Sequence, residues 1–221
     1  MSLVIHRLQQ VSSTQDEARR LVEAGESGRG HVIVADEQSD GRGRFGRTWL
    51  SPAGGLYATF VVASHPLISL ASGVAVLRAL ARFGVDARLK WPNDLVIGGR
   101  KLAGILIETA GDVALVGIGV NLREAPLEAA TSLHAAGGTA RRGELVVAIW
   151  EELCIAEASE DVLTAYREHL TTLSRRVRVA LQEGGTIEGT AVDVDEEGRL
   201  VVETDAGARA ISSGECAHLG S

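Results

Sequence analysis

The spacing of apolar and polar positions divides the chain into two parts. Up to about residue 173, short apolar runs typical of strands alternate with segments of helical spacing. The expected strands are 4–11, 31–35, 56–63, 95–97, 101–108 and 112–122, and the expected helices are 15–24, 70–83, 144–157 and 160–173. We therefore expect an α+β fold for the domain formed by residues 1–173.

From residue 174 onward only short alternating runs occur, at close spacing. They cover 176–181, 186–194 and 200–204 and are separated by glycine-containing turns. This pattern is typical of a small antiparallel barrel or sandwich. Residues 174–221 are therefore expected to form a second, smaller domain that leans on the first, because fewer than 50 residues bury little core by themselves.

The centre of the first part is a predicted hairpin that begins with the polar segment Lys90-Trp91-Pro92-Asn93-Asp94. Pro92 fixes its own φ and restricts Trp91 to an extended conformation. The strand 95–97 then leads to a turn at Gly98-Gly99 and a returning strand 101–108. An ordinary hairpin with exposed charges and a hairpin that presents Lys90, Asn93, Asp94 and Lys101 to a ligand both fit this pattern.

Three glycines lie inside predicted strands, at positions 104, 117 and 119. A glycine in a strand interior loses packing, and one reason for it is a ligand that passes close to the backbone. Gly117 and Gly119 face the same side of their strand, which Asn121 terminates. These positions predict space for a narrow ligand beside the sheet.

Ser12-Ser13-Thr14 precede the helix expected at 15–24, with Asp16 and Glu17 in its first turn. A hydroxyl side chain here can cap the helix. The same hydroxyls and the helix N-terminus can instead hold a polar ligand group. Ser159 is expected to cap the helix 160–173 in the same way.

Residues 39–52, which we call the flap, are rich in glycine and arginine. The stretch 41–47 reads GRGRFGR and holds three glycines and three arginines. It matches the G-x-G-x-x-G string of dinucleotide-binding proteins, but no apolar helix follows and no acidic residue lies about 20 positions later. We therefore interpret it as a mobile flap whose amides and guanidinium groups wrap an anion. The alternative is a solvated basic loop.

Net charge, hydropathy and cysteine content exclude several classes of function. The 221 residues carry a net charge of −7, which argues against a protein that binds nucleic acid by neutralising phosphates. No apolar run approaches the roughly 20 residues that span a bilayer, and the N-terminus has no signal-peptide pattern. The two cysteines, Cys154 and Cys216, form no metal or redox motif. A cytoplasmic protein without a membrane partner is expected.

Several motifs, in order, resemble the biotin protein ligases. They are SSTQDEA, Gln38, GRGRFGRTWLSP, GLYATF, KWPNDLVIGGRKLAGILIE and GIGVNL, and they cover roughly residues 10–122. The resemblance implies a class II synthetase-like catalytic domain, with a mixed or antiparallel sheet flanked by helices, and a C-terminal SH3-like β-barrel. It matches the form that lacks an N-terminal DNA-binding domain, so a repressor function is not expected. Phe45 stands where relatives often have a polar or basic residue.

The resemblance also implies the reaction. Biotin is activated by ATP to biotinyl-5'-AMP with release of pyrophosphate, and is then transferred to a lysine of a biotin carboxyl carrier protein domain. Activation needs no general base, because a carboxylate with a pKa of about 4.5 is already ionised at neutral pH. Cations must instead reduce the repulsion between two anions, with Mg²⁺ between phosphate oxygens. A homodimer through an exposed edge strand is compatible with the pattern.

By resemblance, three groups of residues form the site. The catalytic set is Lys101, Arg42, Arg44 and Asp94. The biotin-binding set is Ser13, Thr14, Gln15, Gln38, Gly41, Arg42, Gly43, Arg44, Lys101, Gly104, Gly117 and Gly119, and the ATP-binding set is Arg47, Trp49, Lys101 and Asn121. Asp94 either serves the acceptor lysine or helps to hold the metal, and no metal ligands are assigned.

Two other functions compete with this interpretation. A lipoate or octanoate ligase shares the fold and the acyl-adenylate chemistry, but the GRGRxGRxW flap favours biotin. An octanoyl transferase would use a nucleophilic cysteine, and neither cysteine lies in a motif. A biotin-binding regulator without catalysis is the second competitor, and the presence of Lys101 with three flap arginines favours an enzyme.

Overall fold

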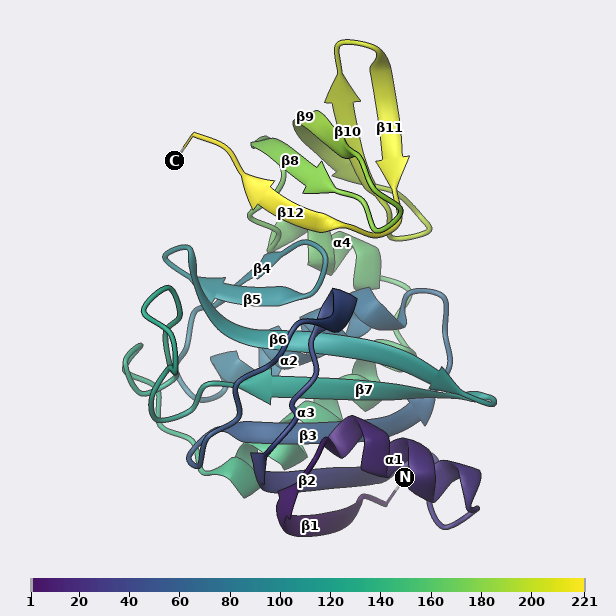
Figure 1. The fold of residues 1–221 in the computed structure, drawn as a ribbon, viewed down its shortest axis with the longest axis vertical. Helices are drawn as coiled ribbons and strands as arrows, with labels where there is room; N and C mark the ends of the chain where they lie inside the picture. Colours follow the sequence, from purple (N-terminus) through teal and green to yellow (C-terminus); the bar gives the residue numbers. More distant parts are fainter. Residues whose placement is uncertain (1, 221) are drawn as a thin grey trace.

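The computed structural model describes residues 2–220, and its larger unit is built on a seven-stranded sheet (Figure 1). The strands are β1 Val4–Val11, β2 His31–Gln38, β3 Leu56–Ala63, β4 Arg88–Lys90, β5 Asp94–Ile97, β6 Arg100–Ala110 and β7 Val113–Val120. Their order in the sheet is β1-β2-β3-β7-β6-β5-β4. The β1–β2 pair is parallel and the other pairs are antiparallel, so the sheet is mixed as expected.

Helices cover both faces of this sheet (Figure 1). Helix α1, Thr14–Glu23, packs through Ala18 and Leu21 on a cluster that contains Ile33 and Leu115. The alternate strand residues point the other way. On that second face lie α2 Ile68–Ala81, α3 Arg142–Glu157 and α4 Val162–Glu168. The cavity described below opens on the face that carries α1.

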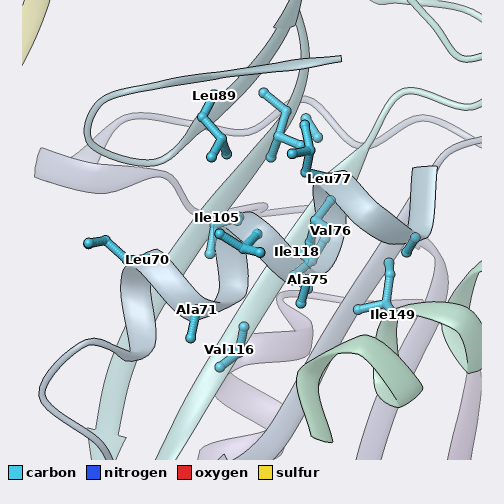
Figure 2. Packing of buried hydrophobic residues seen from close by; sticks show 14 of the residues in the cluster. Leu70, Ala71, Ala75, Val76, Leu77, Leu89, Ile105, Val116, Ile118 and Ile149 are labelled. Carbon is cyan, nitrogen blue, oxygen red and sulfur yellow. The ribbon is translucent and has the colours of Figure 1, made fainter. Parts of the chain in front are cut away.

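Helix α2 is the centre of the main core (Figure 2). It is buried on nearly all sides because it lies between the sheet and α3, which explains its largely apolar sequence. Its residues Leu70, Ala71, Ala75, Val76 and Leu77 are buried in one cluster with Ile105, Val116, Ile118 and Ile149. Burial of each large aliphatic side chain contributes about 1.5–3 kcal/mol, so this face is the rigid support for the site.

The C-terminal residues form a five-stranded antiparallel sheet. Its strands are β8 Arg176–Ala180, β9 Thr186–Val194, β10 Leu200–Thr204, β11 Gly207–Ile211 and β12 Glu215–His218, in the order β11-β10-β9-β8-β12. Within the described residues β11 and β12 do not pair, so the sheet does not close into the expected barrel. Apolar residues of this sheet, including Val177 and Val202, join the same cluster as α2, so the smaller unit does lean on the larger one.

Two sequence expectations were wrong in detail. The helix expected at 160–173 ends at Glu168, because the following residues leave the helix to bond with β4: the Thr171 amide donates to the Leu89 carbonyl at 2.8 Å. Asp161 rather than Ser159 precedes its first turn, and the Ser159 hydroxyl accepts from the Asp161 amide instead. Within residues 2–220 no helix is long and apolar enough to cross a membrane.

Candidate active site

A cavity of about 360 Å³ lies between the N-terminus of α1, the flap and strands β5, β6 and β7. Its volume is in the range of small-molecule sites. Every predicted site residue except Gly41 lines it: Ser13, Thr14, Gln15, Gln38, Arg42, Gly43, Arg44, Arg47, Trp49, Asp94, Lys101, Gly104, Gly117, Gly119 and Asn121. Gly41 lies just behind the wall, where an added Cβ would come 2.3 Å from the Trp49 carbonyl oxygen.

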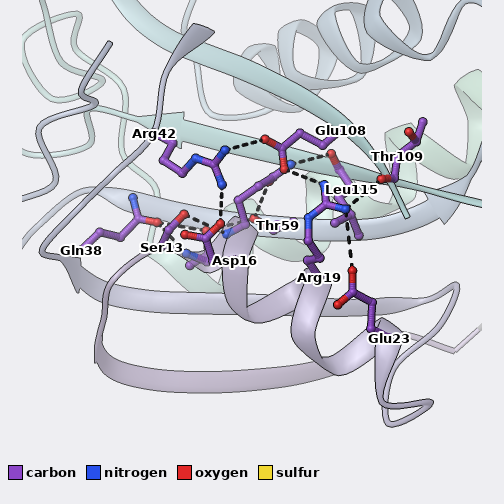
Figure 3. Close-up of polar contacts among 12 residues, drawn as sticks. Ser13, Asp16, Arg19, Glu23, Gln38, Arg42, Thr59, Glu108, Thr109 and Leu115 are labelled. Atoms are coloured by element: carbon purple, nitrogen blue, oxygen red, sulfur yellow. Dashed lines mark hydrogen bonds and ion pairs between the residues drawn. The ribbon is translucent and has the colours of Figure 1, made fainter. Parts of the chain in front are cut away.

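One end of the cavity is a buried polar cluster at the start of α1 (Figure 3). The Ser13 hydroxyl caps the helix by accepting from the Gln15 amide at 3.2 Å, as the sequence predicted. The amide and the hydroxyl of Thr14 both donate to Gln38 Oε1, at 2.8 and 3.1 Å. The Thr59 hydroxyl lies 2.9 Å from that of Thr14 and donates to it. Hydroxyls and amides without a net charge suit a neutral polar group of a ligand.

The glycines on the strands make room for two side chains of the protein itself. A Cβ at Gly117 would lie 2.5 Å from Gln15 Oε1, and a Cβ at Gly119 would lie 2.5 Å from the Trp49 ring. Gly104 is less restricted, with Trp49 at 3.0 Å. The absence of side chains at 117 and 119 is therefore needed for Gln15 and Trp49 to lie against the sheet, and contact of these glycines with a ligand stays a prediction.

The other end of the cavity carries charge. Hairpin β5–β6 turns at Gly98 and Gly99, both with positive φ, and brings Lys101 Nζ within 2.6 Å of Asp94 Oδ1. The contact is a close ion pair, and among the described residues Asp94 Oδ1 has no hydrogen-bond partner. Lys101 Nζ also lies 5.2 Å from the centre of the Trp49 ring. The ammonium group is thus held by a carboxylate and an aromatic face.

Arg42 fastens the flap to the body of the protein (Figure 3). Its guanidinium pairs with Asp16 of α1 and with Glu108 of β6, the latter at 3.1 Å. Arg19 also binds Glu108, at 3.0 Å. Two carboxylates already balance the charge of Arg42 in this structure, and a catalytic role for its side chain stays a prediction.

The other two flap arginines reach the C-terminal sheet. Arg44 Nη2 donates to the Ser213 hydroxyl at 2.6 Å, and Arg47 Nη1 pairs with Glu215 at 2.7 Å. Burial lowers the pKa of Arg44, while the nearby Asp94 carboxylate acts in the opposite direction. A guanidinium remains protonated in proteins, so Arg44 brings a poorly solvated positive charge to the cavity.

One apolar segment of the cavity wall was not predicted from the sequence. Residues Pro126, Leu127, Ala129 and Ala130 line the cavity, although Leu127 is 57% exposed. Asn121 ties this segment to the end of β7, since its side-chain amide donates to the Thr131 carbonyl at 3.0 Å. The sequence signal that could have identified this segment is Leu127, a large apolar residue in a stretch with no helix or strand pattern.

Two family models match the chain. Residues 8–123 match the "Biotin/lipoate A/B protein ligase family", and residues 172–219 match the "Biotin protein ligase C terminal domain". The chain is 33% identical to the biotin--[acetyl-CoA-carboxylase] ligase of Mycobacterium tuberculosis, over 95% of this chain and 87% of that protein. The chain belongs to the biotin protein ligase family.

Other relatives agree. The biotin--[acetyl-CoA-carboxylase] ligase of Paracoccus denitrificans is 32% identical over 94% of this chain and 98% of that protein. The biotin protein ligase from Aquifex aeolicus, solved in complex with biotin and ATP, superposes with a TM-score of 0.85 at 30% identity and covers 99% of each chain. This biotin protein ligase is thus an enzyme that activates biotin with ATP and transfers it to an acceptor.

Sequence reasoning missed three polar residues in or beside the cavity. Thr59 supports Thr14 from β3, Tyr57 lines the cavity, and Ser51 bonds to Gln38. Burial raises the pKa of Tyr57 to about 12, and its hydroxyl donates to the Pro52 carbonyl at 2.7 Å. The only sequence signal was a polar residue within an otherwise apolar strand, as at Thr59.

Proposed function

We propose that the cavity binds biotin with its ring system at the Thr14–Gln38 end and its carboxylate at Lys101. A polar pocket at one end and a cation at the other fit a molecule with a neutral ureido ring and a terminal carboxylate. The observation that carries this orientation is the position of Lys101, which lines the same cavity as Thr14 and Gln38 and is held by Asp94.

In the first step, a carboxylate oxygen of biotin bonds to the α-phosphorus of ATP. The bond from that phosphorus to the oxygen of the leaving pyrophosphate breaks. No proton has to move, because the attacking carboxylate is already ionised. The barrier arises from repulsion between anions, so Lys101 and Arg44 contribute by placing positive charge where negative charge accumulates.

The nucleotide is assigned to the side of the cavity that contains Trp49, Asn121 and Leu127. Within residues 2–220 the indole nitrogen of Trp49 is buried and has no hydrogen-bond partner, which leaves it free to donate to a ligand. Trp49 and Leu127 give this side flat and apolar surfaces that suit a purine base. Arg47 lines the same region and is suited to phosphate oxygens.

The side chains that line the cavity could bind Mg²⁺ only together with the phosphates of ATP. Within residues 2–220 no three histidine, cysteine or acidic side chains are grouped to hold a metal, and Asp94 is the one carboxylate among the cavity residues. Magnesium commonly binds through one or two carboxylates, substrate phosphates and waters. Asp94 would therefore hold it, and the bound ion would offset phosphate charge.

In the second step the acceptor amine attacks the acyl carbon of biotinyl-5'-AMP, AMP leaves, and the amine loses a proton. We propose that the acceptor is the lysine of a biotin carboxyl carrier protein domain, supported by the named activity of the relatives on an acetyl-CoA carboxylase. An acyl-adenylate hydrolyses readily, so water must be excluded until the acceptor arrives. The flap, fastened through Arg42 to Asp16 and Glu108, is suited to that task.

We also propose that residues 1–173 form the catalytic domain and that 174–221 form the smaller domain against which Arg44 and Arg47 rest. A cytoplasmic location, where ATP is available, agrees with this function. A net charge of −7 favours a protein acceptor over nucleic acid as the partner.

The test is transfer to a purified carrier domain of a bacterial acetyl-CoA carboxylase. Intact-mass spectrometry should show one added biotinyl group when the ligase, biotin, ATP and Mg²⁺ are all present. The matched control is a carrier domain whose acceptor lysine is replaced by arginine, which should gain no mass. An unchanged mass for the intact carrier, with adenylate present in the same tube, would reject this acceptor class.

A further inference from the structure

Hydrogen bonds continue from the polar pocket across the base of the flap to Trp49. Gln38 Nε2 donates to the Ser51 hydroxyl at 2.8 Å, and this hydroxyl donates to the Trp49 carbonyl oxygen at 3.0 Å. Ser51 is only 7% exposed. Its backbone is also fixed, because its carbonyl accepts from the Gln38 amide at 3.2 Å. Ser51 is therefore joined to Gln38 on one side and to Trp49 on the other.

The direction of each bond in this series is determined. Gln38 Oε1 accepts twice from Thr14, so the other end of the side-chain amide must face Ser51. The hydroxyl of Ser51 accepts from Gln38 and has one proton, which goes to the Trp49 carbonyl. Bonds arranged head to tail polarise one another, which gives a physical route from Thr14 to the Trp49 carbonyl.

The flap backbone at Gly41 packs closely against all three bonded groups. A Cβ at Gly41 would lie 2.3 Å from the Trp49 carbonyl oxygen, 2.6 Å from Ser51 Oγ and 3.0 Å from Gln38 Nε2. Glycine is thus required where the flap backbone passes over the three bonded groups. The Trp49 carbonyl and the Ser51 hydroxyl are therefore packed together under Gly41, so a shift of the backbone at Trp49 would change their hydrogen bond.

We propose that Ser51 is a positioning residue that couples the biotin end of the cavity to the nucleotide end. It does not line the cavity and acts through Gln38 and Trp49. When biotin binds at Thr14 and Gln38, the amide of Gln38 is fixed, Ser51 is fixed with it, and Trp49 is held ready for the nucleotide. The inference rests on the proposed placement of biotin and ATP.

The experiment measures how much biotin changes the affinity for a nucleotide. Isothermal titration calorimetry gives the Kd of an ATP analogue with a methylene group between the α- and β-phosphorus, with and without saturating biotin. The ratio of the two values is the coupling factor, expected at about 5- to 150-fold in the unchanged protein. Ser51→Ala should lower this factor towards one, while the Kd for biotin alone stays within about twofold.

Two variants serve as controls. Ser51→Thr keeps the hydroxyl and should retain the coupling factor. Ser39→Ala removes an exposed hydroxyl from the other end of the flap and should change nothing. If Ser51→Ala does not fold, Ser51→Cys provides the same comparison, since a thiol is a weak donor and a weak acceptor.

The proposal is overturned if Ser51→Ala keeps the coupling factor of the unchanged protein. This holds even if the variant binds the nucleotide analogue more weakly, provided that its Kd rises by the same factor with and without biotin. It is also overturned if the unchanged protein has a factor of one. Failure of the proposed function would look different: the unchanged protein would then show no heat of biotin binding in the first titration.

Discussion

Lys101 Nζ lies 2.6 Å from Asp94 Oδ1, across the hairpin formed by β5 and β6. The two side chains come from neighbouring strands, so the pair fixes the ammonium at the cavity wall before any substrate arrives. A group that is already in place pays no reorganisation cost when charge develops on the reacting phosphate. In the proposed mechanism, the pair places this ammonium where charge develops during biotin activation.

Replacement of Lys101 tests its role in that step. Lys101→Ala should lower the rate of biotinyl-5'-AMP formation by about 10²–10³-fold, the usual effect of removing one preorganised charge-stabilising group. Since Lys101 is a partly exposed residue outside the core, the thermal unfolding midpoint should change little. Adenylate formation at a near-normal rate would contradict the role assigned to Lys101.

Asp94→Asn separates the two steps of the reaction. It keeps the shape of the side chain but leaves Lys101 without its counter-ion, so adenylate formation should fall about tenfold. Single-turnover transfer from preformed biotinyl-5'-AMP to the carrier domain should fall less. If transfer is the step that slows more, Asp94 serves the acceptor lysine and does not act through Lys101 or a metal ion.

Gly119→Ala tests whether the position of the Trp49 ring against β7 is needed for ATP binding. The new methyl group would lie 2.5 Å from the indole ring and displace it, so the KM for ATP should rise by about tenfold or more, because ring stacking and a hydrogen bond are lost together. Gly143→Ala is a matched control, since its nearest neighbour is at 3.7 Å. An unchanged KM for Gly119→Ala would show that Trp49 does not contact ATP.

Loosening of the flap should be visible by limited trypsin digestion. Glu108→Gln removes one partner of Arg42, and a pair this exposed is worth at most about 1 kcal/mol, so cutting within residues 39–52 should rise by up to about fivefold. Biotin with ATP should protect the same segment in the unchanged protein. Equal cutting of the unchanged protein with and without ligands would reject the flap as a closing element.

The stability of the C-terminal sheet should depend on pH through His218. Burial, with help from Lys90 and Arg175, lowers the pKa of His218 to about 4, against about 6.5 in the unfolded chain. The unfolded state therefore binds more protons between these values, and stability present above about pH 6.5 is lost as the pH falls towards 4.

Because the ring is partly exposed, solvent screening reduces this contribution to about 1–2 kcal/mol. His218→Gln should flatten the fall in unfolding free energy between pH 6.5 and 4.5, measured by urea denaturation. An identical slope for His218→Gln and the unchanged protein would contradict the assignment.

Local sequence signals were sufficient for much of the fold. Turn glycines at 98 and 99 predicted the hairpin that brings Asp94 and Lys101 together, and the capping signal at Ser13 placed the start of α1. The end of α4 was not predicted, because the chain leaves the helix to bond with Leu89, which lies about 80 residues earlier. Local propensity carries no information on such a contact.

The sequence predicted which residues come together at the cavity, but not how they are arranged there. The carboxylate partners of Arg42 lie on α1 and β6, and the link through Ser51 depends on the pairing of Gln38 with Ser51 across the base of the flap. Both follow from tertiary placement of the flap. For the same reason the sequence could show that Gly117 and Gly119 make room, but not that Gln15 and Trp49 fill it.

The most direct test of the central claim is mass spectrometry of the purified protein with ATP and Mg²⁺, given biotin, lipoate or octanoate in separate reactions. The polar pocket at Thr14 and Gln38 together with Lys101 predicts an acyl-adenylate in the biotin reaction alone. An adenylate formed from lipoate or octanoate but not from biotin would contradict it. So would measurable biotin binding with no adenylate in any reaction, since the protein would then bind biotin without activating it.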